Sequence, residues 1–190
     1  DPDRFVVPKT GTYTLLMEGY IYNSADLSYS FALNEVTDVV RAVALDQVIE
    51  GNVTAPGQRN KLTFSLATDT QVFFDTLNAS GLRVTLNGPR GVEFGPQDLR
   101  YSDWQYGNAV RSLVAGDYTL TIEGTSGATG PYALQILTKA SAETLEYGTP
   151  VSGVLDDQGA RQTNYRVEST APLTGGAGQA QRFDGTGPLV

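Results

Sequence analysis

The 190-residue chain contains no histidine and no cysteine. Without cysteine it has no disulfide bond, no thiolate nucleophile and no cysteine-ligated metal. Without histidine it lacks the usual general base near neutral pH, and a Ser-His-Asp arrangement is excluded. The sequence also has neither a Gly-x-Ser-x-Gly elbow nor a phosphate-binding Gly-x-x-x-x-Gly-Lys-Ser/Thr loop. This inventory predicts a protein that is not an enzyme.

Positive charge and long apolar runs are scarce as well. Lysine and arginine number 13 against 21 aspartate and glutamate residues, for a net charge of -8. Proteins that bind nucleic acid or anionic membrane surfaces need clustered basic residues, so neither partner is expected. No run approaches the roughly 18 apolar residues of a transmembrane helix, which argues against membrane insertion. High glycine and threonine, ten tyrosines and the acidic balance are typical of a secreted or cell-surface bacterial protein.

The most informative feature that the chain does have is an internal repeat. Gly-Thr-Tyr-Thr-Leu-Leu-Met-Glu-Gly at 11–19 returns as Gly-Asp-Tyr-Thr-Leu-Thr-Ile-Glu-Gly at 116–124. A second pair, at 48–53 and 150–155, places a glycine at the same point of each copy. Both pairs are separated by roughly a hundred residues, which is a typical domain length. The repeat therefore indicates part of a tandem array of modules.

Wherever the sequence is regular, apolar and polar residues alternate with a period of two. Tyr118, Leu120 and Ile122 fall on one face, with threonine and glutamate between them. This is the pattern of a half-buried strand. Similar strands are predicted at 61–66, 71–75, 82–86 and 132–136. Because glycine- and proline-rich turns separate them, we expect an all-β protein with an antiparallel, jelly-roll-like β-sandwich.

The repeat also predicts where the modules divide. Residues 1–38 would be the closing strands of one module, 39–138 a complete module, and 139–168 the opening strands of a third. The stretch 36–45 lacks glycine and proline and is interpreted as the seam, a helical turn or a linker. The end pieces either pack together as a second, incomplete sandwich, which we favour, or lie against the central module.

Residues 169–190 differ in character from the rest of the chain. They begin as a flexible linker rich in glycine and alanine. The string Ala-Gln-Arg-Phe-Asp-Gly at 180–185 then resembles the opening strand of a laminin-G or concanavalin-like lectin domain. We expect this segment to be the truncated start of a further domain.

Across the central module, the order of short motifs resembles the bacterial pre-peptidase C-terminal domain. The matching elements are Ile49-Gly51-Val53, Leu62-Phe64, Phe74-Asp75, Leu86-Gly88-Pro89-Gly91, Leu113-Ala115-Gly116-Tyr118-Leu120-Ile122 and Gly130-Tyr132-Leu134. The resemblance implies a non-catalytic, jelly-roll-like sandwich found beside secreted proteases and in large repetitive surface proteins. It also implies that calcium bound through acidic loop residues, or a polymeric substrate, is a ligand to consider.

Three acidic residues are candidate metal ligands. Asp75, Asp98 and Asp103 are predicted to lie in or beside loops between central strands, and we expect these loops to converge at one end of a sandwich. Calcium takes six to eight oxygen ligands from carboxylates and loop carbonyls. The alternative is that these are solvated loop acids, with Asp75 capping a turn.

A candidate ligand-binding loop carries Tyr101, Trp104 and Tyr106. Rigid aromatic rings with polar edges can stack on a sugar, so a glycan or polymer is the expected ligand. The alternative is that Trp104 closes one end of the sandwich core. Tyr13 and Tyr118, at repeated positions, are interpreted as core or corner tyrosines with a bonded hydroxyl.

Together these observations predict a non-catalytic module of a large secreted or cell-surface bacterial protein. It would space and orient the neighbouring domains of the same chain, its main partners, and be stabilised by calcium. One alternative is a carbohydrate- or polymer-binding module that uses the Tyr101, Trp104 and Tyr106 loop. Another is an accessory domain of a secreted protease.

Overall fold

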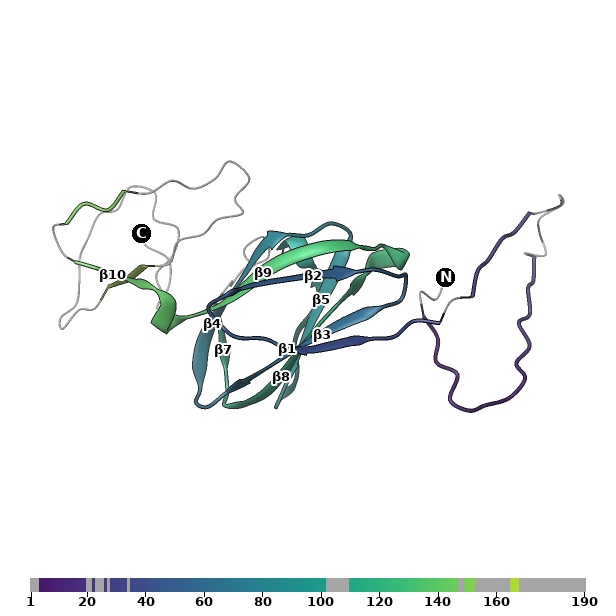
Figure 1. Cartoon of the computed structure of the whole chain (residues 1–190), viewed down its shortest axis with the longest axis horizontal. Coiled ribbons are helices and arrows are strands. Elements are labelled where there is room, and N and C mark those ends of the chain that lie inside the picture. The colour runs from purple at the N-terminus through teal and green to yellow at the C-terminus, as the bar shows by residue number, and fades with distance from the viewer. Residues whose placement is uncertain are drawn as a thin grey trace.

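The computed structural model of the chain describes residues 4–19, 22, 26, 28–33, 35–101, 110–146, 149–152 and 165–167. A β-sandwich forms its centre, with the N-terminal segment beyond one end and strand β10 beyond the other (Figure 1). Within the described residues, no helix is long and apolar enough to cross a membrane.

The first sheet of the sandwich has five strands in the order β1-β3-β8-β5-β6. Their bounds are Val39–Ala42 (β1), Arg59–Leu66 (β3), Gly116–Gly124 (β8), Leu82–Gly88 (β5) and Gly91–Asp98 (β6). Every neighbouring pair is antiparallel except β1 and β3, which run parallel. The parallel strand β1 is therefore an edge strand on an otherwise antiparallel sheet.

The second sheet has four antiparallel strands in the order β2-β9-β4-β7. Their bounds are Val48–Val53 (β2), Gly130–Thr138 (β9), Thr70–Asn78 (β4) and Val110–Leu113 (β7). In the described part of the chain, single 3-10 turns follow three of the strands, at Leu99–Tyr101 (η1), Thr125–Gly127 (η2) and Lys139–Ser141 (η3). The predicted all-β, antiparallel sandwich is confirmed.

The core lies between the sheets and follows the alternation seen in the sequence. In β8, Tyr118, Leu120 and Ile122 are buried, while the residues between them are half-buried on the outer face. Two aromatic contacts lie in the core, the first between neighbouring strands of one sheet and the second between the two sheets. Phe64 stacks on Tyr118 with ring centroids 5.2 Å apart, and Phe74 meets Phe94 edge-on at 5.0 Å. Such pairs add to the stabilisation from apolar burial alone.

The structure corrects the interpretation of residues 36–45. Rather than a helical turn or a linker, this stretch contains β1, which pairs with β3 from Val39 opposite Asn60 to Ala42 opposite Thr63. All four residues of β1 are exposed, so no alternation marks the strand in the sequence. Its β-branched valines fit a strand, and the guanidinium of Arg41 donates a hydrogen bond to the Glu50 carbonyl at 2.6 Å.

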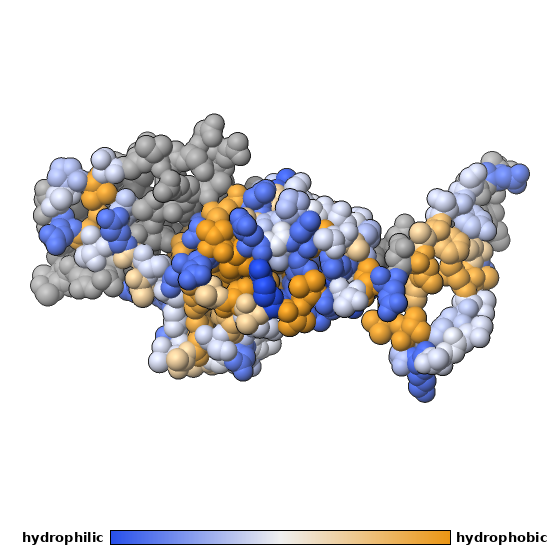
Figure 2. Space-filling model, viewed as in Figure 1, coloured by the Kyte–Doolittle hydropathy of each residue, from blue (hydrophilic) through white to orange (hydrophobic). Residues whose placement is uncertain are grey.

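The segments before and after the sandwich differ in secondary structure. The described residues of 4–38 contain no strand, and Figure 2 shows apolar residues gathered on this segment. After the sandwich, Glu143–Leu145 (β10) and Tyr165–Val167 (β11) form a two-stranded parallel sheet. Whether residues 1–38 and 139–168 belong to neighbouring modules stays a prediction. Residues 169–190, with the lectin-like string, lie outside the described residues.

Candidate functional site

Two of the predicted ligand residues, Asp98 and Tyr101, lie at the turn between β6 and β7, only part of which is described. Asp98 is the last residue of β6, and Tyr101 is the last of η1. Asp103, Trp104 and Tyr106 lie outside the described residues. The aromatic platform and the third calcium ligand therefore stay predictions.

Asp98 is bonded to its own neighbour in the turn. The Arg100 guanidinium donates from Nη2 to Asp98 Oδ2 at 2.8 Å, and the Arg100 backbone N–H donates to Oδ1 at 2.9 Å. The hydrogen bonds from the Arg100 side chain hold the pKa of Asp98 below its usual value, against a smaller effect of burial. The same guanidinium lies 5.2 Å from the ring centroid of Tyr101. The charge of Asp98 is thus balanced by Arg100, and the hydrogen bonds between these two residues stabilise the turn.

Asp75 lies in β4, on the other sheet, and is only 1% exposed. The hydroxyl of the next residue, Thr76, donates to the Leu99 carbonyl at 2.8 Å, which ties β4 to η1. Asp75, Thr76 and Leu99 line a small pocket together with Phe74, Val84, Phe94, Leu120, Leu134 and Gln135. Among the described residues, no group of three or more His, Cys, Asp or Glu is arranged to hold a metal ion. Calcium binding here stays a prediction.

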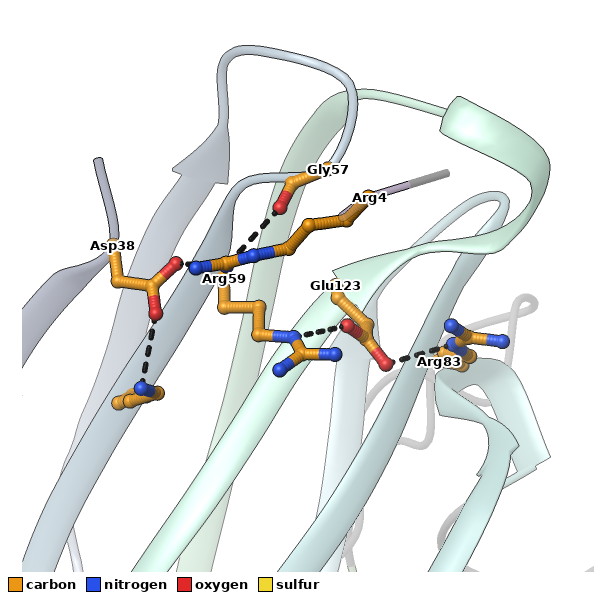
Figure 3. Close-up of polar contacts among 7 residues, drawn as sticks. Arg4, Asp38, Gly57, Arg59, Arg83 and Glu123 are labelled. Atoms are coloured by element: carbon orange, nitrogen blue, oxygen red, sulfur yellow. Dashed lines mark hydrogen bonds and ion pairs between the residues drawn. The ribbon is translucent and has the colours of Figure 1, made fainter. Parts of the chain in front are cut away.

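A charged cluster that the sequence did not reveal lies where the chain enters β1, on the sheet that carries Asp98, and it includes Arg83, which lies opposite Asp98 in the strand register (Figure 3). We call it the Asp38–Glu123 cluster; its members are Arg4, Asp38, Arg59, Lys61, Arg83 and Glu123. Asp38 accepts from Arg4 Nη1 at 2.5 Å and lies 2.9 Å from Lys61 Nζ. Arg4 also donates to the Gly57 carbonyl at 3.4 Å. These contacts fasten the N-terminal segment to β3 and to the turn before it.

The second half of the cluster is a row across three neighbouring strands. Glu123 of β8 lies opposite both Arg59 of β3 and Arg83 of β5 in the strand register. Its two carboxylate oxygens accept from the Nε atoms of these arginines at 2.6 and 2.9 Å. Opposite charges placed side by side on a sheet stabilise the pairing of the strands. The row therefore acts across the centre of the five-stranded sheet.

The electrostatics of Asp38 follow from these contacts. Burial acts to raise the pKa of Asp38, but the hydrogen bonds and charges of Arg4 and Lys61 outweigh it and lower the pKa below its usual value. Both acids of the cluster, Asp38 and Glu123, are paired with cations. Paired carboxylates on an outer face offer neither a free base nor a free nucleophile. The arrangement fits a structural role better than catalysis.

The repeated tyrosines carry the bonded hydroxyl that was predicted. Tyr118 is 1% exposed and donates to the Val114 carbonyl at 2.7 Å, so it is confirmed as a corner tyrosine of the core. Tyr13 makes the same bond to the Lys9 carbonyl at 2.5 Å, but its side chain is 56% exposed. Its bonded hydroxyl is confirmed, whereas a place in a core is not seen in the described residues.

Comparisons with known proteins match the chain by structure alone: no protein-family model and no curated protein matches its sequence. One solved structure is the periplasmic inhibitor of g-type lysozyme PliG from Aeromonas hydrophila, 11% identical, covering 55% of this chain and 100% of its own, with a TM-score of 0.40. Another is the pre-peptidase C-terminal domain of a Bacillus anthracis collagenase, 19% identical, covering 54% and 99%, with a TM-score of 0.42. PliG from Salmonella Typhimurium is 20% identical, covering 52% and 98%, with a TM-score of 0.36. Similarity at this level does not assign the chain to a family.

Proposed function

We propose that this chain is a non-catalytic spacer from a multidomain protein of the bacterial surface or exterior, in which the sandwich sets the distance and direction between its neighbours. The observation that carries the proposal is the path of the backbone. The chain enters at Asp38, where β1 and β3 begin side by side. It leaves at Thr138, whose N–H and hydroxyl donate to the Asp46 carboxylate in the turn after β1, at 2.6 and 2.8 Å.

These two points lie at opposite ends of the sandwich. β9 begins at Gly130, opposite Val53 at the end of β2, and ends at Thr138. It therefore spans the sandwich from one end to the other. At about 3.4 Å per residue, a strand of this length covers roughly 30 Å. A chain that enters at one end and leaves at the other holds its two flanking segments apart by about that distance. Ion pairs at the Asp38 end and hydrogen bonds at the Thr138 end fix both points of attachment.

The distance can be measured directly, because the chain has no native cysteine to interfere with labelling. We expect donor and acceptor dyes on a Thr37→Cys, Lys139→Cys variant to report a single separation of about 30 Å plus the dye linkers. The same dyes on Thr37→Cys and Asn52→Cys, both exposed positions at the Asp38 end, provide the short-distance control. Equal transfer in the two variants would contradict the spacer geometry.

Ligand binding separates a spacer from the alternative, a carbohydrate- or polymer-binding module. A spacer gives no signal for the intact chain on an array of glycans and polysaccharides. A signal that is lost in Trp104→Ala and kept in Trp104→Phe, which still offers a ring for stacking, would instead establish a binding module. The proposal is abandoned in that case.

Calcium binding is a separate prediction, because the spacer proposal rests on where the chain enters and leaves the sandwich and does not require a bound ion. If Asp75, Asp98 and Asp103 bind calcium, the melting temperature rises in millimolar calcium relative to a chelator, since an ion that binds only the folded state stabilises it. Asp103→Asn then removes the rise, while Asp26→Asn, at an exposed position far along the chain, leaves it in place. Identical melts of the unaltered chain in calcium and chelator contradict the prediction.

A further inference from the structure

The N-terminal segment, residues 4–38, is partly buried only near its two ends. Among its described residues, all are exposed except Arg4, Val36 and Asp38, which are half-buried. Figure 1 shows the segment extending beyond the end of the sandwich and returning to it at β1. Its apolar side chains are exposed as well, for example Phe5 at 59% and Leu33 at 72%. In the described part of this segment, burial of apolar surface is therefore not what holds it to the sandwich.

Polar contacts hold the segment at its first end. There, the described contacts with the sandwich are those of one guanidinium. Arg4 donates to Asp38 at 2.5 Å and to the Gly57 carbonyl, in the turn before β3, at 3.4 Å (Figure 3). The Arg4–Asp38 pair thus brings together two residues that are 34 positions apart in the sequence.

The second end has contacts of its own that do not involve Arg4. Lys61 of β3 lies 2.9 Å from the Asp38 carboxylate, and the Gln58 amide donates to the Thr37 carbonyl at 3.3 Å. Pairing of β1 with β3 begins at the next residue, Val39. The place where the chain enters β1 is therefore fixed even when Arg4 has left Asp38.

The Arg4–Asp38 pair is a contact that can open while the sandwich stays folded. It closes a loop of 34 residues, and the entropy lost on closure, which grows with loop length, opposes it. The two side chains are 25% and 16% exposed, so salt in the solvent weakens their attraction. Neither the loop nor the pair contributes to the core, which lies between the two sheets.

Tension along the chain loads this pair before it loads the sandwich. A pull on the backbone at Arg4 acts on a single guanidinium and its two acceptors. A pull across the sandwich acts on the ladders of β9 with β2 and β4, whose hydrogen bonds share the force. One side-chain contact therefore gives way at a lower force than the ladders.

We infer that residues 5–37 are a reserve of chain length, which the Arg4–Asp38 pair holds back and which tension releases. The inference rests on the proposed function, because a chain is under tension only when it joins neighbours. With the pair closed, the chain meets the sandwich at Arg4, and the span to Thr138 is about 30 Å. With the pair open, the 34 residue steps from Arg4 to Asp38 extend it by up to about 110 Å.

The release is reversible. The segment stays tethered at β1 after the pair opens, so Arg4 and Asp38 remain at a high effective concentration. When the tension falls, the pair re-forms and the spacer returns to its short length. The sandwich does not have to refold in this cycle.

The test is single-molecule pulling of the full-length chain through Asp3→Cys and Lys139→Cys, which place the Arg4–Asp38 pair in the path of the force. We expect a reversible step at low force in which the contour length grows by about 11 nm, followed at higher force by unfolding of the sandwich. Pulling through Thr37→Cys and Lys139→Cys bypasses the pair and gives the second event alone.

Two variants show whether the pair controls the step. Arg4→Gln removes the early step and leaves the unfolding force of the sandwich unchanged. Lys9→Gln is the matched control, because it removes one positive charge from an exposed residue of the same segment, and the step remains. In 1 M salt, where charges are screened over about 3 Å, the early step moves to lower force.

Identical traces for the two pairs of anchor positions overturn the inference, and so does an early step that persists in Arg4→Gln. The inference and the proposed function fail separately. If the dyes at residues 37 and 139 report the expected separation but no early step is seen, the chain is a spacer of fixed length and the inference is wrong. An early step in a chain that fails the dye measurement confirms the release of residues 5–37 and contradicts the spacer proposal.

Discussion

At the scale of single residues, the tyrosine hydroxyl at the start of β8 is both a sequence signature and a stabilising contact. Tyr118→Phe leaves the ring packed against Phe64 but removes the donor to the half-buried carbonyl of Val114. We expect a loss of about 1 kcal/mol in the free energy of unfolding, measured by urea denaturation followed by circular dichroism. Tyr13→Phe is the matched control at the repeated but exposed position, and it should change the main transition by much less. Equal losses would show that the hydroxyl does not act through the core.

The carboxylate of Asp38 makes stability depend on pH in a defined direction. Its pKa is lowered in the folded chain from the usual 3.8. A lowered pKa stabilises the fold above the unfolded-state value, and the contribution disappears as the pH falls through the folded-state value. The urea midpoints of the unaltered chain and of Asp38→Asn should therefore differ at pH 7 and converge below about pH 3.8. A constant difference down to strongly acidic pH would contradict the role of its charge, and Asp26→Asn serves as the exposed control.

At the scale of elements, Glu123 links its own strand, β8, to β3 and β5, which are far from it in the sequence but pair with it in the sheet. Replacing it by Gln leaves Arg59 and Arg83 facing a neutral side chain, so the pairing of β8 with β3 and β5 weakens. Because the arginines are partly exposed, we expect a loss of only about 0.5 to 1 kcal/mol. A double-mutant cycle with Arg59→Gln measures the coupling energy between Glu123 and Arg59. This energy should be smaller in 1 M salt, because charges are then screened over about 3 Å. Coupling that is unchanged by salt would contradict an electrostatic origin.

The strands that could be predicted from the sequence are those whose burial pattern is visible in their own residues. β3, β5, β8 and β9 each bury every second residue, so alternation alone identifies them. β1 is four exposed residues at an edge, and only its parallel pairing with β3 makes it a strand. In β6, glycine and proline at Gly95 and Pro96 and the register shifts against β5 interrupt the period of two.

The candidate sites follow the same rule. The bonded hydroxyl of Tyr118 was predictable, because its partner lies four residues away. The Asp38–Glu123 cluster was not, because its members run from Arg4 to Glu123 and only the strand register brings them together. The bond between Asp98 and Arg100 is local, and the two-residue spacing of acid and base could have indicated it before a calcium role was considered.

At the scale of the whole molecule, a spacer must resist being pulled along its length. Force applied at residues 37 and 139 runs parallel to the strands, so the ladders of β9 with β2 and β4 are loaded in shear, many hydrogen bonds at a time. Force applied at Asn52 and Pro131, which lie opposite each other at one end of the β2–β9 ladder, separates the pairs one by one. Single-molecule pulling through cysteines at the first pair should therefore need a higher unfolding force than pulling through the second. Complete extension of residues 39–138 should lengthen the chain by roughly 30 nm, the extended span less the folded one. Equal forces in the two geometries would mean that the path of the chain through the sandwich gives it no mechanical advantage, which would remove the main physical reason for regarding it as a spacer.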